Sequence, residues 1–288
     1  MKTALRALLA ERIDYAGLFP PAALSMADAV ANFASYRESA DAWALARFVL
    51  PVVRLEEFGG FAATHLRGAP WRLAALAQPT DADAIRVFNT RMPGRAHIDS
   101  VESRAATVED VAALAPLAAL ATTYVEIPIH EDPAPLIAAV AAHGLRAKVR
   151  TGGVTAESFP LARDVARFLV TCVQHRVMMK ATAGLHHPLR GEYALTYDAH
   201  AARGTMFGFL NLFLAASFAR QGMDAATLSD LLEEREAGAF RVTDDAVAWR
   251  GHTIGADALA NDRDRFAVSF GSCSFREPLD DLSALSLP

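Results

Sequence analysis

Residues 122–151 read TTYVEIPIHEDPAPLIAAVAAHGLRAKVRT, and this stretch decides the fold. It begins with the strand-like run Thr122–Ile129, continues with the helical run Pro135–His143, and ends with a second strand-like run, Arg146–Thr151. Gly144 follows the helical run, where a helix C-cap favours glycine. A strand, a helix and a strand in so short a segment indicate a parallel βαβ unit.

The same alternation extends over most of the chain. The other predicted strands lie near Tyr15–Phe19, Phe48–Glu57, Trp71–Gln78, His97–Arg104, Val177–Thr182 and Phe266–Gly271. The other predicted helices lie near Met26–Arg47, Asp81–Arg91, Val108–Leu120 and Phe159–His175. Eight strands separated mostly by helices predict an α/β fold, a (β/α)8 barrel of the TIM type. The competing doubly wound sheet would need a glycine-rich turn after its first strand, and Gly17-Leu18-Phe19-Pro20-Pro21 is not one.

The regular rhythm breaks after the seventh predicted strand. We expect one barrel domain over residues 1–288, with an insertion over 185–251. The insertion is predicted to contain a polar connection over 185–205, helices near 206–221 and 224–235, and a hairpin over Phe240–Trp249. A long excursion from the carboxyl end of a barrel strand is typical of a lid over a site. The alternatives are an insertion without a role in the site and a contact between copies in a homo-oligomer.

Composition and charge exclude several classes of partner. The 288 residues are 52% hydrophobic and carry a net charge of −5. A pI near 6.0 argues against nucleic-acid binding, which needs a basic surface. The longest apolar run, Met206–Ala219, is shorter than the roughly twenty residues of a membrane span. We therefore expect a small-molecule ligand and neither a nucleic acid nor a membrane as partner.

The two cysteines, Cys172 and Cys273, are too few for a disulfide framework. Reducing cytoplasm is therefore the expected setting. Cys273 lies among small residues after the last predicted strand, and no histidine is near it in the sequence. We interpret it as a packing residue rather than a nucleophile.

Charged residues are predicted to point into the barrel from consecutive strands. Side chains alternate across a strand, so residues two apart share a face. Val125, Ile127 and Ile129 would then face the helices, and Glu126 would face the interior. The same argument gives five interior charges: Glu102, Glu126, Lys148, Arg150 and Lys180. Because buried unpaired charge is costly, these groups must form a structural layer of salt bridges or meet a ligand. Their place near the carboxyl ends of the strands favours the ligand.

The segment Lys148-Val149-Arg150-Thr151-Gly152-Gly153 predicts an anion site. Arginine offers a bidentate fork to a phosphate or carboxylate, and the glycines let backbone N–H groups approach it. The alternative is a plain strand-to-helix turn. The predicted anion-binding residues are Lys148, Arg150, Gly152, Gly153, Thr182, His186 and Ser272.

Lys180 is the predicted reacting group. Beside two methionines and Arg150, its amine would be desolvated and repelled by like charge, and both effects lower the pKa of a lysine. A neutral amine forms a Schiff base with a carbonyl substrate, and Glu126 or Glu102 would carry the proton. The alternative is that Lys180 pairs with Glu126 or binds an anion.

The segment Lys180-Ala181-Thr182-Ala183-Gly184 resembles the lysine–threonine–glycine context of class I aldolases of the deoxyribose-phosphate type. The resemblance implies a (β/α)8-barrel lyase with a Schiff-base lysine. It departs from that family in one respect. The family's second important lysine lies one strand later, whereas Lys148 lies one strand earlier. For this reading we predict no cofactor.

His186 and His187 follow the same strand, and His187 is the predicted general acid–base. A second hypothesis is that one of them binds a divalent metal with Glu126 or Glu102, although no HExxH or HxH spacing supports zinc. The sequence thus leaves three functions open. They are a Schiff-base lyase or aldolase that uses Lys180, a metal-dependent hydrolase or lyase that uses His186 or His187, and a non-catalytic ligand-binding barrel.

Overall fold

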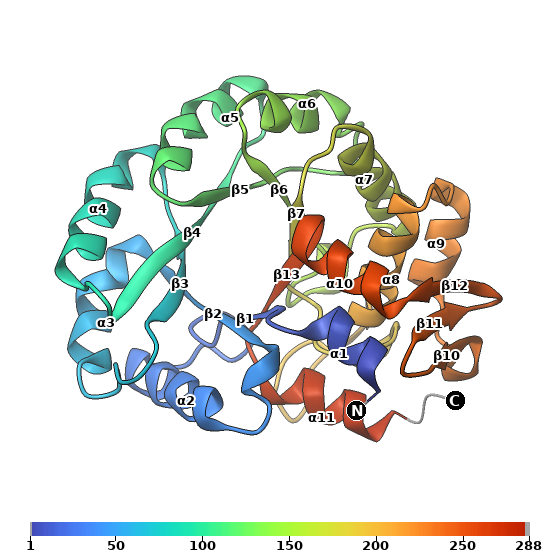
Figure 1. Ribbon diagram of the computed structural model, residues 1–288, viewed down its shortest axis with the longest axis horizontal. Coiled ribbons are helices and arrows are strands. Elements are labelled where there is room, and N and C mark those ends of the chain that lie inside the picture. Colours follow the sequence, from blue (N-terminus) through green and yellow to red (C-terminus); the bar gives the residue numbers. More distant parts are fainter. Residues whose placement is uncertain (1, 286–288) are drawn as a thin grey trace.

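The computed structural model describes residues 2–285, and its centre is a closed barrel of eight strands (Figure 1). The barrel strands are β1 (Ile13–Tyr15), β2 (Leu45–Pro51), β3 (Trp71–Leu76), β4 (Ala96–Arg104), β5 (Thr122–Glu126), β6 (Arg146–Arg150), β7 (Met179–Thr182) and β13 (Ala267–Ser272). Each strand pairs in parallel with the next in chain order, and β13 pairs with β1 to close the barrel. The predicted (β/α)8 barrel of the TIM type is confirmed.

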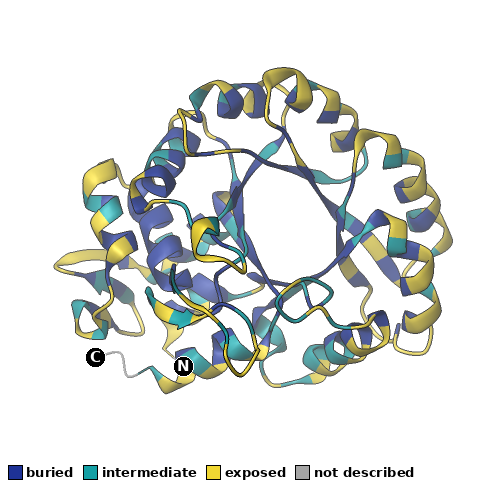
Figure 2. Ribbon diagram, turned by 180° about the vertical axis from the view of Figure 1, so that it is seen from behind, coloured by how far each residue is buried: buried dark blue, intermediate teal, exposed yellow. Residues whose placement is uncertain are grey.

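Helices surround the strands, and their inward faces are buried (Figures 1 and 2). The helices between barrel strands β1 and β7 are α2 (Met26–Glu38), α3 (Leu55–Ala62), α4 (Ala82–Arg91), α5 (Val108–Leu114), α6 (Ala134–Ala142) and α7 (Ala162–Gln174). In α7, Val165, Phe168, Leu169 and Cys172 recur at helical spacing and are fully buried. The helix α1 (Thr3–Leu9) precedes β1, and α11 (Arg276–Ala284) follows β13 (Figure 1).

Two predicted boundaries were wrong near the start of the chain. The strand predicted over Phe48–Glu57 ends at Pro51, and α3 follows. Its buried residues Leu55, Phe58 and Ala62 lie three and four positions apart, which is the helical period and not the strand period. The first strand lies at Ile13–Tyr15, earlier than predicted.

The chain between β7 and β13 forms the predicted insertion. It contains the antiparallel hairpin β8 (Gly191–Ala194) and β9 (Arg203–Met206), the helices α8 (Phe209–Arg220), α9 (Ala225–Glu233) and α10 (Ala256–Arg265), and a three-stranded sheet of β10 (Phe240–Val242), β11 (Ala246–Trp249) and β12 (His252–Gly255). An insertion after the seventh strand is therefore confirmed, although β12 and α10 extend the excursion beyond residue 251. The assignment of 1–288 to one domain stays a prediction, and Met1 and residues 286–288 lie outside the described residues.

Asn211 fixes the insertion from inside. Its side chain is fully buried on α8, and its amide nitrogen donates to the carbonyl oxygens of Leu231 and Glu234, at 2.8 Å each. Its side-chain oxygen accepts a hydrogen bond from the backbone of Arg190 at 3.0 Å. One buried amide thus ties α8 to the end of α9 and to the connection before β8, because a buried polar group must be hydrogen-bonded.

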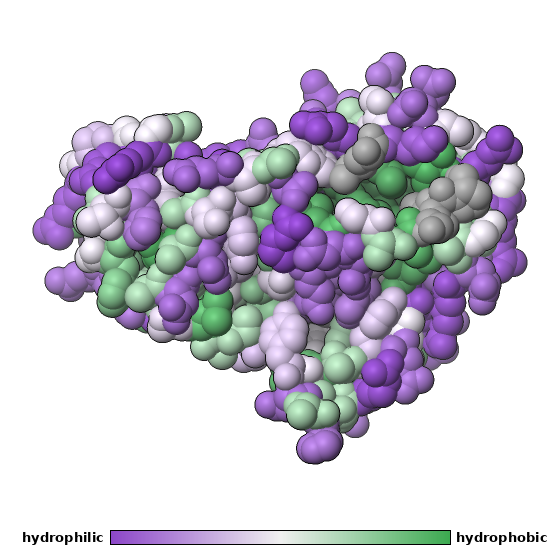
Figure 3. Space-filling view, turned by 90° about the horizontal axis from the view of Figure 1, so that it is seen from below, coloured by the Kyte–Doolittle hydropathy of each residue, from purple (hydrophilic) through white to green (hydrophobic). Residues whose placement is uncertain are grey.

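The surface seen from below is mostly hydrophilic, and hydrophobic side chains are exposed in smaller areas between the charged ones (Figure 3). Among residues 2–285, no helix has both the length and the apolar character needed to cross a membrane. Cys172 and Cys273 are both free and buried.

Candidate active site

A cavity of about 430 Å³ opens at the carboxyl-terminal ends of the barrel strands. Active sites of (β/α)8 barrels lie at this end, and a cavity of this size suits a small metabolite. Phe19, Pro20 and Pro21 form part of its apolar wall. Its charged, thiol and imidazole side chains are Glu102, Arg104, Lys148, Arg150, His186, His187, Cys273 and Glu277.

Charges of alternating sign run across the barrel interior, and two of them, Glu102 and Lys148, also line the cavity. Lys180 Nζ lies 2.5 Å from Asp14 Oδ2 and 2.5 Å from Glu102 Oε1. Lys148 Nζ lies 2.7 Å from Glu102 Oε2 and 2.9 Å from Glu126 Oε2. These five side chains are all buried. The predicted convergence of Glu102, Glu126, Lys148 and Lys180 in one interior is confirmed, and most of their charge is paired within the protein.

The row of charges ends on two arginines at the cavity. Arg150 Nε lies 3.0 Å and Arg104 Nε lies 3.2 Å from the same atom, Oε1 of Glu126. Glu126 already contacts Lys148, so one carboxylate serves three cations. The side chains of Arg150 and Arg104 are 42% and 72% exposed, and both line the cavity. Positive charge is therefore in excess where the cavity meets the ends of β4 and β6.

The predicted state of Lys180 was wrong. Burial by itself would lower the pKa of Lys180, but the carboxylates of Asp14 and Glu102 raise it above its ordinary value. Lys180 is held as an ammonium, and it lies below the cavity rather than along its wall. The sequence analysis missed Asp14, which comes from the three-residue strand β1 and also accepts a hydrogen bond of 2.7 Å from Ser269.

Both interior glutamates are held as carboxylates. Burial would raise the pKa of Glu102, but Lys148 and Lys180 lower it far below its ordinary value. Burial would also raise the pKa of Glu126, and Lys148 and Arg150 lower it. Neither carboxylate is poised to gain a proton near neutral pH, as the predicted proton carrier of a Schiff-base reaction would have to be.

The predicted anion-site residues lie at the ends of β6, β7 and β13. Arg150 and Thr182 are register partners on β6 and β7, and both line the cavity together with Gly152 and Gly153. A Cβ atom on Gly152 would lie 2.4 Å from the Phe159 ring, so glycine is needed for the close packing of this loop. Ser272 does not line the cavity. Strand alternation turns Gly271 towards it instead.

His186 and His187 border the cavity, as predicted for the connection after β7. The carboxylates beside them are not Glu126 or Glu102, the predicted fellow ligands of a metal ion. His186 Nδ1 lies 2.8 Å from Glu277 Oε2, and His187 Nδ1 lies 2.5 Å from Asp281 Oδ2. Both carboxylates belong to α11. Within residues 2–285, no group of three or more histidine, cysteine, aspartate or glutamate side chains is arranged to hold a metal ion.

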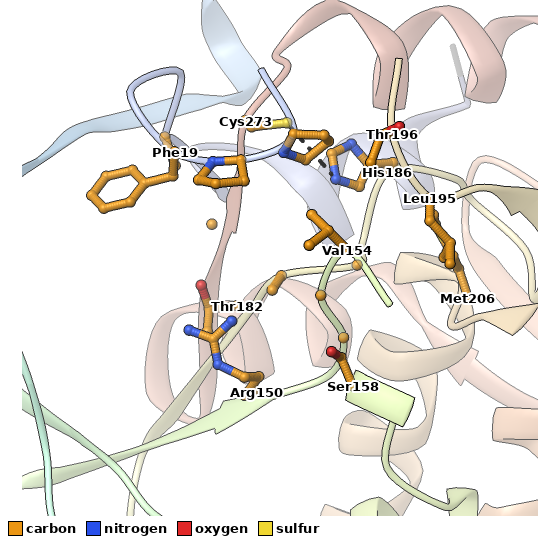
Figure 4. Close-up of a pocket in the computed structure, with 18 of the residues that line it drawn as sticks. Phe19, Arg150, Val154, Ser158, Thr182, His186, Leu195, Thr196, Met206 and Cys273 are labelled. Carbon is orange, nitrogen blue, oxygen red and sulfur yellow. Dashed lines mark hydrogen bonds between the residues drawn. The ribbon is translucent and has the colours of Figure 1, made fainter. Parts of the chain in front are cut away.

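Cys273 meets a histidine that the sequence does not place near it. Cys273 Sγ lies 3.9 Å from His186 Nε2, and the Tyr197 hydroxyl lies 3.6 Å from the same sulfur. Tyr197 also donates a hydrogen bond of 2.9 Å to Glu277 Oε2. Cys273 and His186 lie together at the top of Figure 4, and Arg150, Thr182 and Ser158 lie at the bottom. The interpretation of Cys273 as a packing residue overlooked this contact, because it joins residues 87 positions apart.

His186 has the most strongly shifted imidazole of this cluster. Burial by itself would lower the pKa of His186, but hydrogen bonds to Cys273 and Glu277 raise it to about 10. His186 is therefore an imidazolium near neutral pH. A further cation thus lies at the cavity wall, at the end away from Arg150 (Figure 4).

Comparison with known proteins adds little to this geometry. No protein-family model matches the sequence, and no curated protein matches it. Among solved structures, the chain is similar to lysine/ornithine decarboxylase from Vibrio vulnificus, whose crystal structure was determined in complex with cadaverine. The TM-score is 0.43 at 8% sequence identity, and the alignment covers 93% of this chain and 57% of that one. The chain thus spans little more than half the length of that protein.

The same comparison corrects one prediction. The solved structure is of a decarboxylase and not of an aldolase of the kind that the Lys180 segment resembles. We therefore withdraw the prediction that the protein works without a cofactor. At 8% identity, no particular cofactor takes its place.

Proposed function

We propose that this protein is an enzyme that binds a small phosphorylated or carboxylated metabolite in the cavity at the carboxyl-terminal mouth of its barrel. One observation carries the proposal. Arg150 and Arg104 share a single carboxylate oxygen of Glu126, and both arginines line the cavity. An oxyanion of a ligand would give these two arginines a second negative partner besides Glu126.

Arginine suits this task better than the interior lysines. Lys180 and Lys148 each contact two carboxylates, so their charge is already balanced. The guanidinium of Arg150 uses Nε for Glu126, and its side chain is 42% exposed. Its terminal N–H groups can form the bidentate contact that phosphate and carboxylate groups favour.

The proposal of an enzyme rather than a binding protein rests on the other end of the cavity. There, His186 and Tyr197 each contact both Glu277 and Cys273, and the pKa of His186 is raised to about 10. Titratable groups with perturbed pKa values in a concave site are typical of catalysis. Lys180 is not part of this proposal, because its ammonium is paired below the cavity.

Titration calorimetry with inorganic phosphate tests the anion site. We expect the Arg150→Gln substitution to weaken phosphate binding about 10- to 100-fold, the worth of about 1.5–3 kcal/mol for hydrogen bonds to a charged group. Arg150→Lys should give a smaller loss, since it keeps the charge and removes the fork. Arg163→Gln is the matched control, because Arg163 is exposed on α7 outside the cavity. Equal phosphate affinity in wild type and in the Arg150→Gln and Arg104→Gln variants would contradict the proposal.

A further inference from the structure

Three side chains from two separate parts of the chain meet at the upper end of the cavity. Cys273 follows β13, His186 lies in the connection after β7, and Glu277 lies in the first turn of α11. The sulfur lies 3.9 Å from His186 Nε2, and His186 Nδ1 lies 2.8 Å from Glu277 Oε2. A nucleophile, a base and a carboxylate that orients the base are in the order found in serine and cysteine triads.

The carboxylate of this group is itself held in place. The Tyr197 hydroxyl donates to Glu277 Oε2 at 2.9 Å, and the backbone N–H of Glu277 donates to Ser274 Oγ at 3.1 Å. The same Tyr197 hydroxyl lies 3.6 Å from the Cys273 sulfur. The imidazole is thus fixed on one side by Glu277, and its other nitrogen points at the thiol.

His186, whose Nε2 lies 3.9 Å from the Cys273 sulfur, is an imidazolium near neutral pH. The thiolate is the nucleophilic form of cysteine, and a positive charge beside the sulfur is typical of reactive cysteines. The other titratable groups in contact with the pair are Tyr197 and Glu277. The position of His186 therefore suits a part in a reaction at the sulfur.

Cys172 provides an internal contrast. It lies on α7, is fully buried, and packs in the apolar core. Burial raises the pKa of the Cys172 thiol well above its ordinary value. The chain therefore contains one cysteine in an apolar core and one at a cavity beside a histidine.

We infer that Cys273, His186 and Glu277 are a catalytic triad, and that Cys273 takes the acyl group of an ester, amide or thioester substrate that carries an anionic group. This inference rests on the proposed function, because it uses the same cavity and names the substrate class. Arg150 and Thr182 lie at one end of the labelled residues, Cys273 and His186 lie at the other, and Val154 lies between them (Figure 4). A substrate with an oxyanion at one end and an acyl carbon at the other fits this separation.

The reaction balances with water as the second substrate. The thiolate sulfur bonds to the acyl carbon, and the carbonyl π electrons move to oxygen. As that intermediate collapses, the leaving group departs with the proton of His186 Nε2, and a thioester on Cys273 remains. His186 then accepts a proton from water as the water oxygen attacks the thioester carbon. The carbon–sulfur bond breaks, and the carboxylic acid product and the thiolate result, with His186 protonated again.

Alkylation with iodoacetamide, followed by peptide mass spectrometry, tests the activated thiol. We expect Cys273 to react at nearly the same rate at pH 6 and pH 8, whereas an ordinary thiol, with a pKa of about 8.5, reacts far more slowly at pH 6. His186→Ala should lower the rate at Cys273 at least tenfold at pH 6 and restore the ordinary pH profile. Glu277→Gln should lower it by less. Cys172 should remain unmodified while the protein is folded.

An acyl probe tests the reaction class. On incubation with mono-4-nitrophenyl glutarate, we expect release of nitrophenol and a protein mass increased by one glutaryl group on Cys273. Cys172→Ser should retain this adduct, and Cys273→Ser should lose it. Failure to acylate Cys273, or alkylation of Cys273 with the pH profile of an ordinary thiol, would overturn the inference. Iodoacetamide carries no charge, so its rate of reaction with Cys273 does not depend on the anion site. The phosphate titration can therefore contradict the proposed function while the alkylation supports the triad, and the reverse is equally possible.

Discussion

At the amino-terminal mouth of the barrel, Arg47 and Arg72 line a hollow of about 420 Å³, and each makes two hydrogen bonds to carboxylate oxygens. At the carboxyl-terminal mouth, Arg150 and Arg104 each make one carboxylate contact, to the same atom, Glu126 Oε1. At the amino-terminal mouth, Arg47 forms hydrogen bonds of 2.6 and 3.0 Å to Asp99. Arg72 also binds Asp99, at 2.8 Å, and reaches Glu11 at 3.0 Å. The cation-rich carboxyl-terminal mouth contains a thiol–imidazole pair as well.

We interpret this difference as one of role. The arginines at the amino-terminal mouth stabilise the fold, and those at the carboxyl-terminal mouth remain available to a ligand. Arg47 and Arg72, with two carboxylate contacts each, have less capacity left for an anion. Arg150 and Arg104 compete for Glu126 Oε1, so a phosphate or carboxylate can relieve them. This matches the general division of (β/α)8 barrels, in which the amino-terminal face contributes stability and the carboxyl-terminal face contributes the site.

The largest effect is expected midway between the two mouths, at Glu102. Glu102→Gln leaves the buried ammonium groups of Lys148 and Lys180 without their shared partner. Breaking a buried ion pair in this way costs about 3–5 kcal/mol, and we expect a loss of that order in the free energy of unfolding, measured by urea titration. Asp83→Asn is the control, because Asp83 is exposed and pairs only with its helix neighbour Arg86. A Glu102→Gln variant as stable as the control would show that the row of charges does not stabilise the barrel.

Acid should weaken the fold through the same carboxylates. The pKa values of Glu102, Glu126 and Asp99 are all lower in the folded chain than their ordinary values, so their contribution is present above the unfolded pKa of about 4 and is lost as the pH falls through the folded pKa. We expect the free energy of unfolding to fall by roughly 2 kcal/mol or more between pH 5 and pH 3. The Glu102→Gln variant should show a shallower fall over that range, and an identical slope would count against the assignment.

A substitution at the amino-terminal mouth should change stability without changing binding. Asp99→Asn removes the carboxylate between Arg47 and Arg72, and we expect a loss of about 1–3 kcal/mol in the free energy of unfolding. Phosphate affinity should stay at the wild-type value. Arg150→Gln should do the reverse, since its side chain is partly exposed and Glu126 keeps its contacts with Lys148 and Arg104. If Asp99→Asn weakens phosphate binding as much as Arg150→Gln does, the two mouths do not have separate roles.

The smallest effect is expected at Tyr197. Tyr197→Phe removes one hydrogen bond to Glu277 and the hydroxyl beside the Cys273 sulfur. A neutral hydrogen bond contributes about 0.5–1.5 kcal/mol, so the iodoacetamide rate at Cys273 should fall by about two- to tenfold. Stability should not change, because Tyr197 is 56% exposed. An unchanged rate would mean that Tyr197 does not help to orient the triad.

Much of the fold could be predicted from the sequence, because the alternation of strands and helices is local. The boundary that failed is instructive. Adjacent Glu56 and Glu57 interrupt an apolar run, and over so short a run the helical and strand periods cannot be separated. Strand alternation also correctly predicted Glu102, Glu126, Lys148 and Lys180 in the interior. That rule requires only that one knows which alternate residues of each strand are apolar and face the helices.

The partners of those residues could not be predicted in the same way. Asp14 meets Lys180 across 166 positions, and the strand that carries it has only three residues, too few to show a phase. Without Asp14, the sequence analysis expected repulsion at Lys180 and a lowered pKa, and the opposite holds. The contact between Cys273 and His186 depends on how β13, α11 and the connection after β7 meet, which no local pattern records.

The rates at which iodoacetate and iodoacetamide alkylate Cys273 test the central claim most directly. Both rates depend on the reactivity of the thiol, but only the rate of the anionic iodoacetate also depends on the cations at the carboxyl-terminal mouth. The account predicts that the ratio of the iodoacetate rate to the iodoacetamide rate is higher at Cys273 than for N-acetylcysteine. It also predicts that Arg150→Gln lowers this ratio while the iodoacetamide rate stays the same. A ratio equal to that of N-acetylcysteine, unaffected by Arg150→Gln, would contradict the claim that one cavity joins an anion site to an activated thiol.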